Sequence, residues 1–209
     1  MNDVCFTNVN IKNITEQGNY KILSCTTQIP TEQRGFINAI VFVYIDKVLF
    51  SEKNENKRTK DMLSVDKSIC VTGKTVHEIK NGQIAFRVLV QNARRIEMSR
   101  NKYEVNVKLF DVCIDTLVHQ RNLLTNREEV LCKYFNSDDK NTPARDIIIS
   151  VPIAKVPVLK DNTSFNLSGS FVIRQTANKL YPVIITRTFV KDTKLDENIY
   201  LRDLDTQRR

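Results

Sequence analysis

Short runs in which apolar and polar residues alternate make up most of this chain, and polar turns separate them. A period of two places alternate side chains on opposite faces of an extended strand, whereas an amphipathic helix needs a period near 3.6. The pattern recurs in roughly nine or ten runs along the chain. We therefore predict a mainly β protein, built as an antiparallel β-sandwich or barrel-like domain.

The N-terminal third of the sequence predicts a hairpin and a central strand. Residues 4–14 and 20–29 are strand-like runs on either side of the turn sequence Glu16-Gln17-Gly18-Asn19, so they are expected to pair. Residues 36–50 carry apolar side chains at both parities, which is typical of a strand buried on both faces. We expect this run to form the centre of the core.

The middle of the chain predicts three consecutive strands. Residues 69–79 and 84–96 are joined through Asn81-Gly82, a pair that tolerates the positive φ values of a type I′ turn. Residues 103–114 follow after a second short connection. The three runs are predicted to form one antiparallel meander.

One helix and one edge strand are predicted in the second half of the chain. Thr125 and Glu128 have the spacing of a capping box, which predicts a short α-helix over residues 125–135. Its apolar residues fall on one stripe: Val130, Leu131, Tyr134 and Phe135. Residues 147–159 contain two prolines, which cannot donate to a strand ladder, so this run is expected at a sheet edge or in two pieces.

Length and cysteine usage bound the organisation of the protein. With 209 residues the chain has room for one full core, and we predict a single β-rich domain over residues 1–191 and a polar, mobile tail over residues 192–209. The five cysteines include no Cys-x-x-Cys pair, and no signal peptide or long apolar stretch is evident. We expect an intracellular protein in a reducing compartment, the cytoplasm or the nucleus.

Catalytic, cofactor and metal signals are weak. Thr72-Gly73-Lys74-Thr75 matches the end of a phosphate-binding loop, but Ser68 stands where that motif needs its first glycine, so we interpret the segment as strand. His77 and His119 are the only histidines, neither lies beside an obvious nucleophile, and no ligand spacing for a metal is present. We predict a non-enzymatic protein without catalytic residues, cofactor, metal or small-molecule substrate.

Positive charge is concentrated in one segment. The chain has 32 Lys and Arg against 24 Asp and Glu, a net charge of +8, and residues 80–108 hold seven of these cations and two glutamates. Such a concentration favours polyanionic partners. The predicted polyanion-binding residues are Arg87, Arg94, Arg95, Arg100, Lys102 and Lys108. On the outer face of this meander only Phe110 has the parity of a stacking aromatic, which argues against base readout.

Two functions are compatible with this pattern. The first is sequence-independent binding of nucleic acid or nucleoprotein through backbone contacts, with affinity that falls as salt rises. The second is a structural assembly protein, such as a viral matrix or capsid-type subunit, that contacts an acidic membrane surface or nucleocapsid and forms homo-oligomers through edge strands. In that case the protein would be found in the virion.

Overall fold

The computed structural model describes residues 3–48, 61–80, 82–122, 127–134, 145–152, 164–177 and 179–191. Nearly all of them are in β-strands, which confirms the predicted mainly β fold. Contacts divide the chain into two compact units. The first unit holds residues 2–107 and 171–181, and the second holds residue 1 with residues 108–170 and 182–209. The single-domain organisation remains a prediction, and the tail lies outside the described residues.

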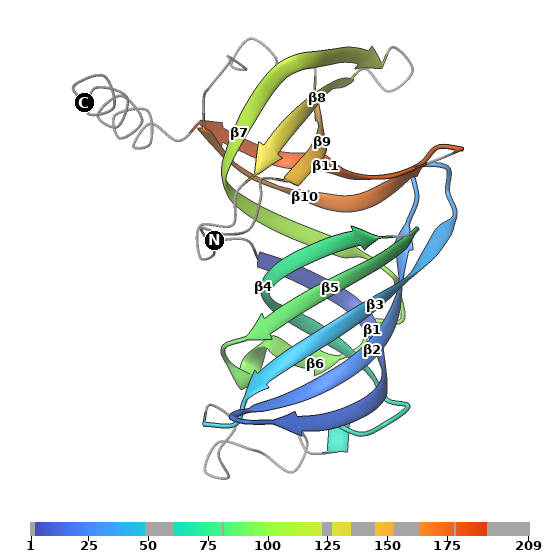
Figure 1. Cartoon of the computed structure of the whole chain (residues 1–209), viewed down its shortest axis with the longest axis vertical. Coiled ribbons are helices and arrows are strands. Elements are labelled where there is room, and N and C mark those ends of the chain that lie inside the picture. Colours follow the sequence, from blue (N-terminus) through green and yellow to red (C-terminus); the bar gives the residue numbers. More distant parts are fainter. Residues whose placement is uncertain are drawn as a thin grey trace, which may run out of the picture. The chain divides into compact units, whose positions relative to one another are not determined.

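The first unit is a closed barrel of five strands (Figure 1). Its strands are β1 (Asp3–Gln17), β2 (Tyr20–Pro30), β3 (Phe36–Asp46), β4 (Ser68–Lys80) and β5 (Gln83–Val90). They are hydrogen-bonded in the order β1-β2-β3-β5-β4, and β4 closes the barrel by pairing with β1. All of these pairings are antiparallel except β3 with β5. A five-stranded barrel of this kind is an OB-fold.

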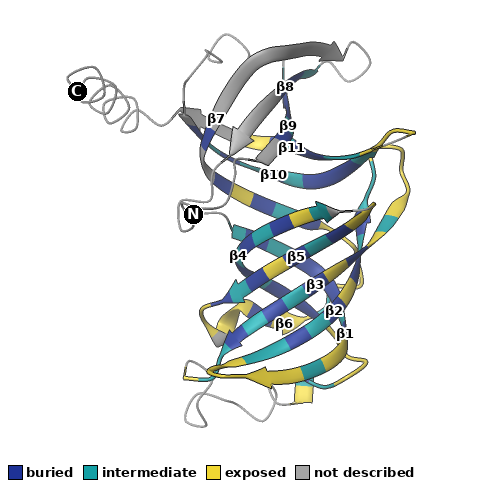
Figure 2. Cartoon of the chain, in the orientation of Figure 1, coloured by how far each residue is buried: buried dark blue, intermediate teal, exposed yellow. Residues whose placement is uncertain are grey.

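Buried positions, dark blue in Figure 2, recur along the strands of the barrel. The side chains buried there are mostly aromatic and aliphatic. Phe6 and Phe86 meet edge to face with ring centroids 4.9 Å apart, and Phe171 packs on Phe86 at 5.5 Å. His77 is buried against the same rings, 5.7 Å from Phe171. This histidine is therefore a core residue of β4 in the segment that we interpreted as strand, and that interpretation is confirmed.

Both predicted hairpins are present. Gln17 pairs with Tyr20 across the first turn and Lys80 pairs with Gln83 across the second, with Gly18 and Gly82 at positive φ. The third strand of the predicted meander is placed wrongly, because both edges of β5 are already occupied by β4 and β3. The chain after β5 forms a 3-10 helix, η1 (Ala93–Arg95), and a short strand, β6 (Ile96–Met98), which pairs with β4.

The second unit repeats the strand order of the first. Its strands are β7 (Val105–Asn122), β8 (Arg127–Tyr134), β9 (Arg145–Pro152), β10 (Ser164–Gln175) and β11 (Leu180–Lys191), three of which extend into the first unit. The order is β7-β8-β9-β11-β10, β10 also pairs with β7, and β9 is parallel to β11. The third and fifth strands are thus the parallel pair in both units.

The two units also share a steric requirement. A Cβ added at Gly73 of β4 would lie 2.4 Å from the carbonyl oxygen of Leu89 on β5. A Cβ added at Gly169 of β10 would lie 2.3 Å from the carbonyl oxygen of Ile185 on β11. Each fourth strand therefore carries a glycine where the fifth strand crosses too closely for any side chain.

One prediction for the second unit is wrong, and one of the two alternatives for residues 147–159 is excluded, while the other extends beyond the described residues. The segment predicted as a helix over residues 125–135 contains strand β8, which pairs with β7 on one side and β9 on the other. A helix of about three turns is marginal alone, so two ladders of backbone hydrogen bonds outweigh one capping box. Residues 145–152 are not at an edge, because β9 lies between β8 and β11, and Pro152 is the last residue of that strand.

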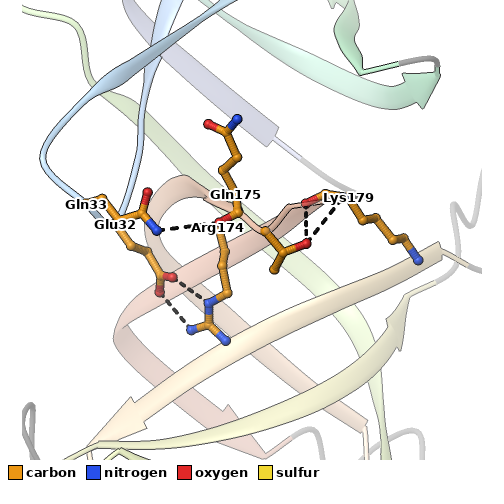
Figure 3. A network of polar contacts seen from close by, with 6 residues as sticks. Glu32, Gln33, Arg174, Gln175 and Lys179 are labelled. Atoms are coloured by element: carbon orange, nitrogen blue, oxygen red, sulfur yellow. Dashed lines mark hydrogen bonds and ion pairs between the residues drawn. The ribbon is translucent and has the colours of Figure 1, made fainter.

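The turn between β2 and β3 is held by a polar network within the first unit (Figure 3). Arg174 of β10 makes two hydrogen bonds to the carboxylate of Glu32, at 2.5 and 3.0 Å. Thr31 bridges to Ile173, and the Thr31 hydroxyl accepts a hydrogen bond from the Gly35 amide at 2.9 Å. These contacts fix the backbone immediately before Phe36, the first residue of β3.

Within the described residues, no helix has the length and apolar character needed to span a membrane.

Candidate functional site

The outer surface of β3 carries a row of mostly apolar side chains. Even-numbered residues of β3 point away from the core, which corrects the prediction that this strand is buried on both faces. Phe36 is 56% exposed and Ile40 is 37% exposed, while Phe42 and Tyr44 are half-buried. Closing a small barrel leaves each strand only one interior face, so the second apolar face of β3 must lie outside. We call the outward-facing residues of this strand from Phe36 to Tyr44 the β3 face: Phe36, Asn38, Ile40, Phe42 and Tyr44.

A cation lies directly beside this row. In the parallel pairing of β3 with β5, Phe42 is in register with Arg87 and Tyr44 with Leu89. The side chain of Arg87 is exposed, and its guanidinium group makes no hydrogen bond or ion pair with any other described residue. An unpaired guanidinium next to an accessible aromatic ring can contact a phosphate while the ring stacks on a base.

The β1–β2 turn limits the β3 face at the end of Tyr44. Tyr20 follows this turn, and its ring lies 6.2 Å from that of Tyr44 in an edge-to-face arrangement. The ammonium group of Lys47 donates a hydrogen bond to the Glu16 carboxylate at 2.6 Å, and this contact lowers the pKa of Glu16. The Lys47 amide donates to the carbonyl of Asn19 at 2.8 Å, so the turn is tied to the end of β3.

The opposite end of the β3 face meets a loop that follows β6. Phe36 packs edge to face on Tyr103, which is 36% exposed, with ring centroids 6.0 Å apart. The loop is attached to the buried residue Thr7, whose amide donates to the carbonyl of Glu104 at 3.1 Å. The hydroxyl of Thr7 donates to the carbonyl of Lys102 at 2.5 Å and accepts from the Glu104 amide at 2.9 Å.

The six cations predicted from sequence come from several elements of the structure. Arg87 lies on β5, Arg94 and Arg95 form η1, and Arg100 and Lys102 lie in the loop after β6. Lys108 belongs to the second unit. Arg95 and Arg100 have acidic neighbours at 3.5 Å, namely Asp3 and Glu97. Of the six, only Arg87 is in register with an aromatic residue of the β3 face.

A pair of thiols lies on the outer side of β1 and β4. Cys5 is in register with Thr72, two residues from Cys70 on the same strand. A hydrogen bond from the Cys70 thiol, helped by Thr72 and by the charge of Arg100, lowers the pKa of Cys5 from 9.0 to about 6. The same contact together with burial raises the pKa of Cys70, and burial alone raises that of Cys25 to about 12. Cys5 is therefore the thiol of the three that is ionised at neutral pH.

Sequence reasoning missed the aromatic residues of this site. Among the strands after Lys80 only Phe110 has the parity of a stacking residue, and its side chain lies outside the described part of the structure. The signal was present in residues 36–44, where aromatic residues recur at even positions. The odd positions of this run are equally apolar, so the run as a whole predicts a strand buried on both faces and not one with an exposed aromatic face.

Comparison with solved structures identifies a protein of similar fold. A deletion mutant of the single-stranded DNA binding protein from Thermus aquaticus superposes with a TM-score of 0.51 at 11% sequence identity. The match covers 92% of this chain and 94% of that one. At this identity the likeness is one of fold.

Two further matches have lower TM-scores. The p204 HINb domain has a TM-score of 0.26 at 9% identity, and the match covers 88% of this chain and 95% of that one. A murine DNA binding protein bound with ds DNA has a TM-score of 0.27 at 11% identity, covering 88% of this chain and 98% of that one. No protein-family model and no curated protein sequence matches this chain.

Proposed function

We propose that this protein is a non-enzymatic binder of single-stranded nucleic acid and that the β3 face with Arg87 is its contact surface. The observation that carries the proposal is the register of Phe42 with Arg87, in which an aromatic ring lies beside a cation that has no side-chain partner among the described residues. Aromatic side chains stack on any base, while cations follow the phosphates, so the combination suits sequence-independent binding. An OB-fold binds oligonucleotides through the face of its second and third strands.

Single strands fit this surface better than duplexes. Bases stack on a protein ring only when they are not paired and stacked in a helix. The bases of an intact duplex therefore cannot stack on the apolar side chains of the β3 face. The single-stranded DNA binding protein from Thermus aquaticus has a similar fold. The other predicted cations of the first unit, Arg94, Arg95, Arg100 and Lys102, are proposed as further phosphate contacts, and Lys108 as one in the second unit.

The ion pairs of the outer cations do not prevent such contacts. Arg100 and Glu97 have side chains 65% and 57% exposed at a separation of 3.5 Å. Surface pairs of this kind contribute about 0 to 1 kcal/mol, so exchanging a carboxylate for a phosphate costs little. The proposal therefore predicts a strong salt dependence, with a slope of about −0.7 in log K against log salt for each phosphate contacted.

Fluorescence anisotropy with a labelled oligodeoxythymidylate of about 16 nucleotides, titrated at several salt concentrations, tests the proposal. Phe42→Ala is expected to weaken binding roughly 5- to 140-fold without changing the salt slope, because it removes one stacking contact of about 1 to 3 kcal/mol. Arg87→Ala is expected to reduce the slope by about 0.7. Phe42→Tyr and Arg87→Lys are the controls, since each keeps the ring or the charge.

The proposal is wrong if Phe42→Ala and Arg87→Ala both bind as tightly as the unmodified protein at every salt concentration. A duplex of the same length should compete poorly with the single strand. Equal competition by the duplex would also contradict the proposal, because it would mean that exposed bases are not needed.

A further inference from the structure

We infer that the contact surface does not end with the β3 face but continues onto the loop after β6, where Phe36, Tyr103 and Lys102 form a second binding station for the same single strand. This inference rests on the proposed function and specifies how far along the barrel the strand is held. It adds a segment outside the barrel strands, residues 99–104, to the site.

The geometry of β3 joins the two stations. Tyr44 and Phe36 lie on the same side of one strand, eight residues apart, which corresponds to about 26 Å at a rise of roughly 3.3 Å per residue. Ile40 and Asn38, both exposed, lie between them. The outer surface is therefore continuous from the first turn of the barrel to the loop.

The ring pair at the far end is accessible although it is built from two distant segments. Phe36 is the most exposed aromatic residue of the described structure, at 56%, and its only described ring partner is Tyr103. Leaving such a ring in water forgoes the stabilisation that burial would provide, which is reasonable at a position that another molecule covers. The edge-to-face contact leaves ring surface available for a base.

The station holds one cation, Lys102, whose ammonium group makes no ion pair with any other described residue, and this favours a polyanionic occupant. Arg100 and Lys102 precede Tyr103 on the loop and are both exposed, and Glu104 follows it. Glu97 pairs with Arg100, and Glu104 is the other carboxylate of the loop region. A cation next to an exposed aromatic pair repeats the combination of Arg87 with Phe42, and it suits a strand whose bases and phosphates alternate.

The station is held in place before any ligand binds. Thr7 is 3% exposed, and its carbonyl accepts from the Arg100 amide at 3.2 Å and from the Ser99 hydroxyl at 3.4 Å, in addition to its contacts with Lys102 and Glu104. Asn101 turns the loop with φ 54. On the other side, Glu32 and Arg174 fix the turn that precedes Phe36 (Figure 3). Binding at a rigid station loses little conformational entropy.

The test is a length series of labelled oligodeoxythymidylates from about 4 to 16 nucleotides, measured by anisotropy with the full chain. Affinity of the unmodified protein is expected to rise with length until both stations are filled. The double variant Phe36→Ala/Tyr103→Ala is expected to reach its plateau at a shorter length, to bind long oligonucleotides at least 5-fold more weakly, and to bind the shortest ones unchanged.

Matched variants separate ring, charge and folding effects. Phe36→Tyr/Tyr103→Phe keeps both rings and should behave like the unmodified protein. Lys102→Ala should reduce the salt slope on long oligonucleotides only, whereas Lys12→Ala, on β1 and 3.8 Å from Asp66, should leave it unchanged. Both replaced rings are exposed, so circular dichroism melts of the double variant should match those of the unmodified protein.

The inference is overturned if the double variant loses affinity equally at every length or loses none. Its failure is distinct from failure of the proposed function. If only the second station is wrong, Phe42→Ala still weakens binding at all lengths. If the proposed function is wrong, the unmodified protein binds no oligonucleotide of the series.

Discussion

Replacing Gly73 by alanine is predicted to destabilise the first barrel through a collision with backbone. The added Cβ would lie 2.4 Å from the Leu89 carbonyl oxygen and 2.8 Å from Cγ1 of Val88. To reach 3.0 Å, below which Cβ contacts are essentially never found, β4 and β5 must separate by roughly 0.6 Å. The obstacle is a strand carbonyl and not a flexible side-chain end, so the strands cannot relax cheaply.

We expect a loss of about 2 to 3 kcal/mol, the upper part of the range for overpacking. For a chain of this size that loss lowers the melting temperature by roughly 4 to 12 °C. Circular dichroism melts and urea titrations measure both quantities. Ser24→Thr is the matched control, because it adds a methyl group to the outer side of β2 and should change stability by less than about 0.5 kcal/mol.

Gly169→Ala provides the second half of this prediction. The added Cβ would lie 2.3 Å from the Ile185 carbonyl oxygen and 2.9 Å from Cγ2 of Ile184. The loss in free energy of unfolding should therefore equal that of Gly73→Ala within about 1 kcal/mol. A melting temperature of Gly73→Ala within the error of the unmodified protein would refute the steric reasoning. A harmless Gly169→Ala beside a damaging Gly73→Ala would refute the equivalence of the two units.

Two further predictions concern the second unit and the thiol pair. Arg127 donates to the Ser150 hydroxyl at 2.9 Å, to the Ser150 carbonyl at 2.6 Å and to the Thr186 carbonyl at 3.0 Å, so Arg127→Ala should cost about 2 to 4 kcal/mol in urea titrations. Arg127→Lys should lower the free energy of unfolding by less than Arg127→Ala does. An equal loss in the two variants would show that the hydrogen bonds of Arg127 are not the cause of the destabilisation. Iodoacetamide should alkylate Cys5 with a midpoint near pH 6, read by peptide mass spectrometry, because its pKa is lowered from 9.0 to about 6. Cys70→Ala should raise that midpoint while Cys70→Ser, which keeps a donor, should not; an unchanged midpoint in Cys70→Ala would contradict the assignment. Since the folded pKa of Cys5 lies below its unfolded value, the thiolate contributes stability that grows between about pH 6 and 9 and is lost as the pH falls through 6.

Local patterns predicted the local parts of the fold. The period-two alternation of residues 84–90 and the turns at Gly18 and Gly82 were enough to predict strands and hairpins, because both depend on neighbouring residues only. The same reasoning failed at residues 125–135, where a capping box and an apolar stripe are equally local signals. Pairing with β7 and β9 overrode them.

The sequence by itself determined that this protein is β-rich, that it is basic, and that its charge is concentrated after Lys80. Only the tertiary structure decided which face of β3 is exposed and which cation lies next to it. Barrel closure leaves one interior face per strand, and the parallel pairing of β3 with β5 brings together Phe42 and Arg87, which are 45 positions apart. Contacts between residues so distant in sequence depend on strand order, and no local pattern specifies strand order.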